Sequence, residues 1–362
     1  MRIVVFCPSA VGDATMATPT FRAVRDGFPE ASIACVVKPN TAAVLEGGPW
    51  FNETILFHPG SKNKNLRSAA VIRLLKYRRF DIALLLPNTF RTAAIALLGG
   101  VKRRIGYDRY ARGLLLTDRL VPPRDSRRKL TPTPIVPYYL EIARRLGLAV
   151  TSTRLELYTT ADDEAAADAA FDSLGIERDR RVIAINTGGA FGPAKNWPIE
   201  HFAKLARRLG DETDSTVLVV CGPGERDNAR AIVARADHRR VVTFADRPLG
   251  IGLSKACVKR SSLLITTDSG PRHFATAFGV PVLTIFGPTH IAWTRTYHPH
   301  AMHIYHPVDC GPCQRPECPL GHHRCMRDLT PDRVFQAAIR MLTQKQNRSL
   351  SNENNSILNA NI

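Results

Sequence analysis

Four short loops rich in small residues carry the side chains that could do chemistry, and each one follows an apolar run of residues. The first loop, Pro8–Ala14, consists mostly of small residues and contains Asp13. Small residues let the backbone approach a ligand closely, and a carboxylate beside a bound hydroxyl can take its proton as that hydroxyl attacks. Asp13 is therefore a candidate general base. The alternative interpretation is that Asp13 caps the helix that follows.

The second loop, Asn186–Pro198, combines three glycines with a hydroxyl, Thr187, and a cation, Lys195. Backbone N–H groups around Gly189 and the charge of Lys195 suit a diphosphate leaving group. The lysine is not followed by Ser or Thr, so the loop is not a Walker motif. The alternative is a glycine-rich turn with an exposed lysine.

The third and fourth loops also join an apolar run to a helical pattern. In the third loop, Glu225 could accept hydrogen bonds from ribose hydroxyls, or it could complement the dipole of the next helix. The fourth loop, Thr266–His273, places a helix start after a strand, where free N–H groups favour an anion. Capping is an alternative for its Asp, and burial in the core is an alternative for its His. Its candidate ligand-binding residues are Asp268, Ser269, Gly270 and His273.

Strands and helices must alternate along the chain to position these loops. We expect strands at Ile3–Cys7, Ile33–Val37, Thr54–Phe57, Asp81–Leu86, Val182–Asn186, Thr216–Cys221, Val241–Phe244, Ser262–Thr267 and Val280–Phe286. We expect helices at Thr20–Asp26, Leu66–Tyr77, Thr92–Leu98, Ile135–Leu146, Ile199–Leu209, Glu225–Ala236, Leu249–Lys259 and Arg272–Phe278, and mostly loop over 107–134. The pattern predicts an α/β protein with two doubly wound, Rossmann-like domains, in which ligands bind beyond the carboxyl ends of strands in a cleft. The expected domains are 1–155 and 156–345, with a disordered tail at 346–362.

The positive charge of the chain is concentrated in one region. The formal net charge is +18, and residues 61–130 hold 18 Lys or Arg against 4 Asp or Glu. Such a field attracts a polyanion, which could be a nucleic acid, an anionic membrane surface or a phosphorylated substrate; a generally basic, solvated surface is the alternative. The apolar runs are too short to span a bilayer, and the first residues resemble a strand rather than a signal peptide. We therefore expect a cytoplasmic protein.

Four of the eight cysteines cluster near the end of the chain with the spacing C-x₂-C-x₄-C-x₆-C. They are Cys310, Cys313, Cys318 and Cys325, and the last gap contains His322 and His323. Four thiolates, or three with one histidine, could complete a tetrahedral structural zinc site. Packed reduced thiols and disulfides are the alternatives, and a cytosolic protein disfavours disulfides.

Taken together, these motifs resemble the heptosyltransferases of glycosyltransferase family nine, which have the GT-B fold. The resemblance runs from Met1 to about Leu342 and includes residues 12–19, 189–198, 267–273 and 286–289. The cysteine-rich end is similar to that of the members which add the second heptose of the inner core. Two positions depart from the family pattern: Thr267 stands where Asn is usual, and Arg272 stands where Met is common.

The resemblance implies an inverting, metal-independent transfer of heptose from ADP-heptose to an anionic heptosyl–Kdo–lipid A acceptor. On this basis Asp13 is the general base, and Lys195 with the helix after Gly270 stabilises the departing ADP. Glu225 and Asp268 lie on the nucleotide and sugar side, and His273 contacts phosphate. The basic residues Arg103, Arg104 and Arg112 resemble the family's basic loop and are the expected acceptor-binding residues. The protein would meet the anionic inner membrane peripherally, with no nucleic-acid partner.

Three alternatives remain open from the sequence. A related family member could use another nucleotide sugar or acceptor with the same fold and residues. A GT-B sugar epimerase would need further acid or base groups, and no clear second catalytic carboxylate is present. A nucleic-acid-binding module would explain the charge, but it lacks the interleaved aromatic residues of single-strand binders.

Overall fold

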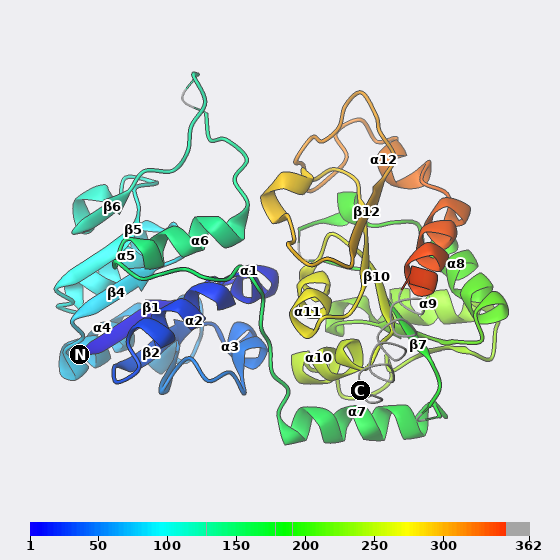
Figure 1. The fold of residues 1–362 in the computed structure, drawn as a ribbon, viewed down its shortest axis with the longest axis horizontal. Helices are drawn as coiled ribbons and strands as arrows, with labels where there is room; N and C mark the ends of the chain where they lie inside the picture. The colour runs from blue at the N-terminus through cyan, green and yellow to red at the C-terminus, as the bar shows by residue number, and fades with distance from the viewer. Residues whose placement is uncertain (128, 178, 190, 345–362) are drawn as a thin grey trace, which may run out of the picture. The chain divides into compact units, whose positions relative to one another are not determined.

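A computed structural model describes residues 1–127, 129–177, 179–189 and 191–344 of the chain, which form two compact units (Figure 1). Unit 1 comprises Met1–Thr160 together with Ile291–Tyr297. Unit 2 begins at Ala161 and holds the remaining described residues. The tail expected at 346–362 lies outside the described residues.

Unit 1 is a parallel sheet with helices. Its strands are β1 Arg2–Phe6, β2 Ser32–Val37, β3 Glu53–Leu56, β4 Ile82–Leu85, β5 Arg103–Tyr107 and β6 Asp118–Leu120. Its helices are α1 Val11–Met16, α2 Thr18–Gly27, α3 Pro39–Leu45, α4 Ser68–Arg78, α5 Phe90–Leu98 and α6 Ile135–Arg144, with short 3₁₀ turns at η1 Lys64–Leu66, η2 Gly113–Leu115 and η5 Ile291–Thr294. The strand order is β3-β2-β1-β4-β5-β6, and every neighbouring pair is parallel. The order reverses between β1 and β4, and ligands of such sheets bind at this switch point.

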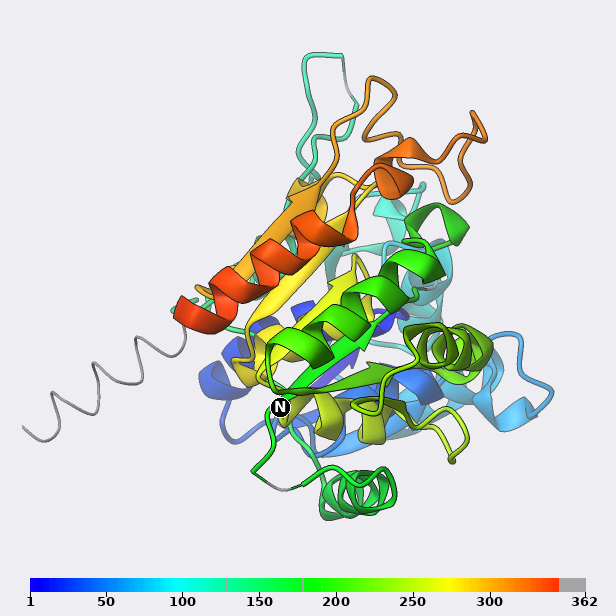
Figure 2. The same cartoon turned by 90° about the vertical axis from the view of Figure 1, so that its right-hand side faces the viewer.

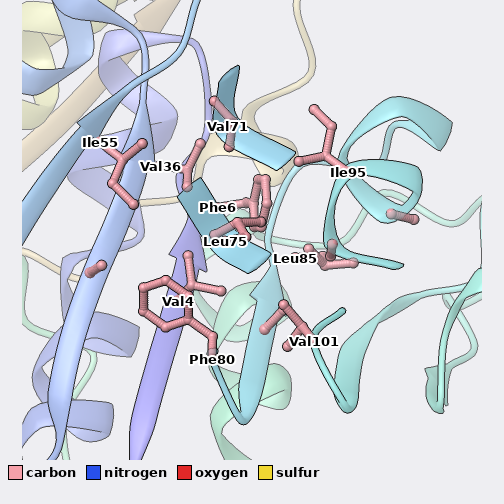
Figure 3. Packing of buried hydrophobic residues seen from close by; sticks show 14 of the residues in the cluster. Val4, Phe6, Val36, Ile55, Val71, Leu75, Phe80, Leu85, Ile95 and Val101 are labelled. Carbon is pink, nitrogen blue, oxygen red and sulfur yellow. The ribbon is translucent and has the colours of Figure 1, made fainter. Parts of the chain in front are cut away.

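The core of unit 1 follows from the alternation of side chains along each strand. Val4 and Phe6 face α4 and α5, where they pack with Leu75 and Ile95 in one buried cluster (Figure 3). The intervening residues Ile3 and Val5 are equally buried, so the opposite face of the sheet is also covered. On that side α2 packs against α6, and both helices contribute buried apolar residues. Helices therefore cover both faces, as a doubly wound sheet requires.

Unit 2 repeats the same plan. Its strands are β7 Val182–Asn186, β8 Thr216–Val220, β9 Val241–Thr243, β10 Leu263–Thr267, β11 Val282–Phe286 and β12 Ala301–Tyr305. Its helices are α7 Ala161–Ser173, α8 Ile199–Glu212, α9 Arg226–Ala236, α10 Ile251–Lys259, α11 Gly270–Phe278 and α12 Arg324–Arg327, with 3₁₀ turns η3 Pro193–Lys195 and η4 Pro223–Glu225 and a helix over 331–344. The parallel order β12-β11-β10-β7-β8-β9 puts the switch point between β7 and β10.

The C-terminal helix, 331–344, covers one face of this second sheet beside α8 (Figure 2). The two helices are joined where the Arg208 guanidinium lies 3.8 Å from the centroid of the Phe335 ring. A guanidinium placed over an aromatic face is attracted to the electrons of the ring. This contact therefore fixes the C-terminal helix to α8.

The predicted fold class, α/β with two doubly wound sheets, is confirmed. Every expected strand is present with bounds shifted by two residues at most, and β7 matches at both ends. The interpretation of 107–134 as mostly loop overlooked β6, whose three residues are not fully buried. The Ala-rich α7 was not expected, because only Ala167 and Ala170 are buried and no apolar stripe marks the helix.

Candidate functional site

Within unit 2, the second, third and fourth candidate loops, which follow β7, β8 and β10, meet at the carboxyl edge of the sheet. A Cβ atom added to Gly188 would lie 1.7 Å from Glu225 Oε1, so the loop after β7 runs directly against Glu225. A Cβ atom added to Gly189 would lie 3.2 Å from Ser269 Cβ, so the same loop also packs on the turn after β10. Glycine permits both close approaches. The structure thus brings residues of all three loops together at one switch point.

Lys195 is held between two of these loops. Its Nζ donates to Asp268 Oδ2 at 2.7 Å and to the Asp268 backbone oxygen at 2.8 Å. The amine also lies 4.6 Å from the centroid of the Phe191 ring. The lysine side chain is only 12% exposed, so the alternative of an exposed lysine in a turn is wrong. Ala190, in the same loop, lies outside the described residues.

Asp268 is the centre of a buried cluster with two cations and one carboxylate. Its carboxylate accepts hydrogen bonds from Lys195, from Arg272 Nη1 at 2.9 Å and from Thr289 Oγ1 at 2.8 Å. Burial alone would raise the pKa of the Asp268 carboxyl, but Arg272 and Lys195 together lower it well below its usual range. The carboxyl is therefore ionised, and the cluster keeps one positive charge in excess.

His273 lies beside this cluster, and its side chain is uncharged. The residue is buried, and burial with the charge of Arg272 lowers its pKa to about 3. Its imidazole is therefore neutral near pH 7 and could offer a phosphate only a hydrogen bond. The core-histidine alternative describes its burial correctly, and a phosphate contact stays a prediction.

The turn at Ser269 leads directly into α11. Ser269 is the N-cap residue, yet its hydroxyl does not cap the helix; it bonds Asn186 Oδ1 at 2.9 Å and Thr266 Oγ1 at 3.0 Å. Pro271 in the first turn has no N–H to satisfy. The remaining N–H groups at the start of α11, at Gly270 among others, are therefore available to an anion.

Glu225 and Thr187 complete this edge of unit 2. Glu225 Oε2 accepts from the Gly222 N–H at 2.8 Å, whereas Oε1 faces Gly188. The Thr187 hydroxyl is buried and has no hydrogen-bond partner among the residues that the structure describes. An orphaned buried hydroxyl costs about 1–3 kcal/mol, which a polar ligand or a water could relieve.

In unit 1, Asp13 lies in the first turn of α1, beyond the carboxyl end of β1 and so at the switch point. The N-cap residue of α1 is Ala10, so the alternative in which Asp13 caps the helix is wrong. Its charge reaches the buried Tyr139, whose pKa is raised well above its ordinary value, first by burial and then by Asp13. The carboxylate is half-buried at an edge where a ligand would bind.

Arg103 and Arg104, the predicted acceptor-binding residues, do not lie at the edge of the sheet where Asp13 lies. Both residues begin β5, and the parallel register pairs Arg103 with Ile82 at the start of β4. They therefore lie at the amino end of the sheet, whereas Asp13 follows the carboxyl end of β1. Arg103 pairs with Asp118 at 2.9 Å, and Arg104 donates to backbone oxygens such as that of Leu115 at 2.7 Å.

Arg112, the third predicted acceptor-binding residue, is not an exposed charge. Its side chain is completely buried, and its guanidinium donates to the backbone oxygens of Leu85, Pro87 and Tyr107 and to Asn88 Oδ1. Burial lowers its pKa to about 10, so it stays charged at neutral pH. With its donors used in this way, Arg112 fixes the ends of β4 and β5 rather than presenting a charge to a ligand.

A cavity of about 410 Å³ opens at the carboxyl edge of unit 1 instead. Its apolar lining includes Phe6, Val36 and Phe57, and its polar lining residues are Ser9, Lys38, Thr89, Arg91 and Thr92. Within the described ranges, neither Lys38 nor Arg91 forms a salt bridge with a carboxylate. The sequence pattern did not single out these two cations, although their positions after β2 and after β4 were the available signal.

The four clustered cysteines are predicted either to bind zinc or to pack as reduced thiols. Nowhere in the described part of the chain do three or more His, Cys, Asp or Glu side chains lie close enough to hold a metal ion. Cys310 Sγ and His322 Nε2 are 3.8 Å apart. Burial and the nearby thiols of Cys313, Cys318 and Cys310 raise the pKa of Cys325 to about 11. The thiols thus lie near one another, and zinc binding stays a prediction.

Among residues 1–127, 129–177, 179–189 and 191–344, no helix combines the length and the apolar character needed to cross a bilayer.

Comparison with known proteins connects this geometry with one family. The family model described as "Glycosyltransferase family 9 (heptosyltransferase)" matches residues 68–324. Lipopolysaccharide heptosyltransferase 2 of Escherichia coli (strain K12) is 26% identical over 361 residues, which cover 96% of this chain and 100% of that protein. Lipooligosaccharide heptosyltransferase 2 of Haemophilus ducreyi is 26% identical over 367 residues, which cover 94% of this chain and 99% of that protein.

Solved structures show the same fold. The structure of the Escherichia coli ADP-heptose lipopolysaccharide heptosyltransferase II matches with a TM-score of 0.77 at 24% identity, covering 96% of this chain and 100% of that one. A family 9 glycosyl transferase from Veillonella parvula matches with a TM-score of 0.79 at 23% identity, covering 95% and 97% of the two chains. The expected GT-B fold is confirmed.

Proposed function

The chain belongs to glycosyltransferase family 9, the heptosyltransferases, and on that premise we propose which sugar it transfers and to what. The donor is ADP-L-glycero-β-D-manno-heptose, and the acceptor is the heptosyl–Kdo–lipid A of the lipopolysaccharide inner core. The names of the relatives support this assignment, since those matching over nearly their full length are heptosyltransferases 2. Transfer inverts the anomeric carbon.

The observation that carries the proposal is the anion site of unit 2. Lys195 and Arg272 share the single carboxylate of Asp268, which leaves one positive charge in excess, and the start of α11 adds N–H groups beside it. An ADP leaving group develops negative charge on its diphosphate as the glycosidic bond breaks. A fixed positive charge and helix N–H groups stabilise that charge, so the step needs no metal ion. Glu225 is the candidate partner for the ribose.

Asp13 is the proposed general base. Its carboxylate takes the proton of the attacking acceptor hydroxyl as the new bond to the anomeric carbon forms and ADP departs with its electron pair. One displacement of this kind inverts the configuration. Asp13 fits the role because it lies half-buried at the switch point of unit 1 and makes no helix cap.

The acceptor's anionic groups are proposed to bind in the cavity at the carboxyl edge of unit 1, rather than at Arg103, Arg104 and Arg112. Lys38 and Arg91 supply positive charge there, and Ser9 lies in the loop that leads to Asp13. The apolar lining residues suit the carbon faces of sugar rings. The wider basic region at 61–130 would hold the protein at the cytoplasmic face of an anionic inner membrane, at about 1 kcal/mol per cation near the surface.

A donor panel tests the nucleotide and the sugar. The protein is heated with ADP-heptose, with other ADP-sugars and with UDP- and GDP-sugars, and the melting temperature is recorded. A ligand at a hundred times its dissociation constant stabilises by about 2.7 kcal/mol. We expect ADP-heptose to give the largest shift. A larger shift with a UDP- or GDP-sugar would replace the proposed donor.

A double variant tests the acceptor cavity. Lys38→Ala/Arg91→Ala should raise the acceptor KM by about tenfold or more, because it removes two charge-assisted contacts, and should leave the donor KM unchanged. The control is Arg73→Ala/Lys76→Ala, which removes the same charge from exposed positions on α4. An equal effect of both variants would mean that only the overall charge matters.

A further inference from the structure

The cysteine-rich segment, residues 306–329, is not used by the proposed chemistry, yet it contacts the loop that carries Lys195 and the turn after β11 that supports Asp268. It runs from the end of the edge strand β12 to the helix over 331–344. A long connection with several prolines ordinarily runs over the surface of the protein. Here its contacts with the rest of unit 2 gather at the anion site.

The first contact is with the residue directly before Lys195. The N–H of Ala194 donates to the backbone oxygen of Pro316 at 2.9 Å, and the carbonyl of Ala194 lies 2.7 Å from His323 Nε2. A carbonyl only accepts, so His323 Nε2 carries the proton of this bond. Both backbone groups of Ala194 are therefore taken by the cysteine-rich segment.

The approach at this point is close enough to need a glycine. A Cβ atom added to Gly192 would lie 2.5 Å from the Pro316 backbone oxygen, and Gly192 has φ 142°. Immediately beyond Lys195, the buried Trp197 donates from Nε1 to the Leu329 oxygen at 2.9 Å. The segment thus contacts the loop Asn186–Pro198 on both sides of Lys195.

The second contact is with the turn that supports Asp268. The N–H of Gln314 donates to the Pro288 oxygen at 2.8 Å, and a Cβ atom added to Gly287 would lie 2.3 Å from Met326 Sδ. The next residue of that turn, Thr289, donates to Asp268. The segment therefore contacts the loop that carries Lys195 directly, and it contacts the turn after β11 whose Thr289 supports Asp268.

His323 is the side chain through which this support reaches the lysine loop. It is the N-cap residue of α12 and has a left-handed backbone, with φ 52°, and its side chain does not cap the helix but bonds Ala194. The neighbouring His322 bonds differently: its Nδ1 accepts from the Arg324 N–H at 3.0 Å, and its Nε2 lies near Cys310. Two adjacent histidines therefore have separable roles.

We propose that His323 is a positioning residue for Lys195, through which the cysteine-rich segment fixes the loop that delivers the lysine amine to the donor's diphosphate. This inference rests on the proposed function, because it assigns Lys195 to the diphosphate. It gives the segment a part in donor binding that requires no metal ion and no redox step.

The test is a calorimetric titration of ADP into the full-length protein and five variants, one of which is the Lys195→Ala background and one the double variant built on it. His323→Ala should weaken ADP binding about three- to tenfold, the worth of one hydrogen bond, while the control His322→Ala should leave it unchanged. His323→Gln, which keeps an N–H donor, should recover part of the loss. In a Lys195→Ala background, His323→Ala should have no further effect, because its influence passes through that lysine.

Several outcomes would overturn the assignment. A full, additive loss in the Lys195→Ala background would show that His323 acts elsewhere, and so would equal losses for His322→Ala and His323→Ala. The His323→Ala variant could also lower the melting temperature. In that case His323→Gln must still bind ADP more tightly than His323→Ala does; otherwise the positioning role is wrong. Wild-type binding of ADP with no effect of His323→Ala refutes this inference alone. Folded wild-type protein that fails to bind ADP refutes the proposed function as well.

Discussion

Replacing Lys195 by Ala removes the charge on which donor binding is proposed to depend. In the structure the Lys195 amine and the Arg272 guanidinium share one carboxylate, Asp268, so the cluster has an excess of one positive charge. The variant leaves Arg272 and Asp268 as a balanced pair. The ADP diphosphate would then meet a site with no excess charge.

The expected loss of ADP affinity follows from the contact that Lys195 would make with the diphosphate and from the burial of its side chain. A charge-assisted hydrogen bond contributes about 1.5–3 kcal/mol, which corresponds to a factor of about 10–150 in affinity. The Lys195 side chain is 12% exposed, so salt should screen the interaction only weakly. We therefore expect ADP affinity to fall by more than tenfold and the loss to persist at high ionic strength. Turnover should fall as well, because the leaving group loses its stabilising charge.

The assay is ADP titration together with donor kinetics for Lys195→Ala, for Lys195→Arg and for Lys204→Ala. Lys204 is an exposed residue of α8 and controls for a change in net charge alone. Lys195→Arg keeps the charge and should retain more affinity than Lys195→Ala. If Lys195→Ala binds ADP within twofold of wild type, or if Lys204→Ala matches it, the assignment of the diphosphate to Lys195 is refuted.

Three further predictions follow from the same geometry. Asp13→Asn should lower kcat by about 10²–10⁴ while leaving ADP affinity nearly unchanged; turnover near wild type would leave Asp13 with only a dipole role in α1. Acidification from pH 7 to pH 5 should destabilise the fold through His273: its pKa is about 3 when folded and 6.5 ordinarily, so only the unfolded chain gains a proton, and the stability present above pH 6.5 falls by about 2 kcal/mol at pH 5. The melting temperature of His273→Asn should depend less on pH between 7 and 5 than that of the wild type. An equal dependence would contradict the low pKa of the folded His273. Metal analysis of tag-free protein decides the cysteine site: stoichiometric zinc that is lost in Cys313→Ser would establish it, and a metal-free active protein would exclude it.

The loops of unit 2 could be recognised in the sequence because local signals agree there. Glycines, a lysine and a helix start each follow an apolar strand, and the parallel sheet then brings the loops to one edge. What the sequence could not show is the pairing within that edge. Lys195 and Asp268 are far apart in the chain, and only the fold reveals that the lysine's partner is this carboxylate.

The basic residues of unit 1 could not be assigned from local pattern. Three arginines that are close in sequence differ in their positions in the fold. The direction of β5 places Arg103 and Arg104 at the opposite edge of the sheet from Asp13, and Arg112 is buried. Lys38 and Arg91 are far apart in sequence and meet only because β2 and β4 flank β1. Charge density along a chain thus indicates the kind of partner, whereas topology decides which charges face it.

The most direct test of the central claim is a transfer reaction followed by mass spectrometry. Purified protein is incubated with ADP-L-glycero-β-D-manno-heptose and heptosyl–Kdo–lipid A, and the acceptor's mass is measured against a reaction with Asp13→Asn. The proposed function predicts that wild-type protein adds one heptose to the acceptor and releases one ADP for each transfer, while the variant adds almost none. Folded wild-type protein that leaves the acceptor's mass unchanged, or that modifies it only when a UDP- or GDP-sugar is supplied, would contradict the claim.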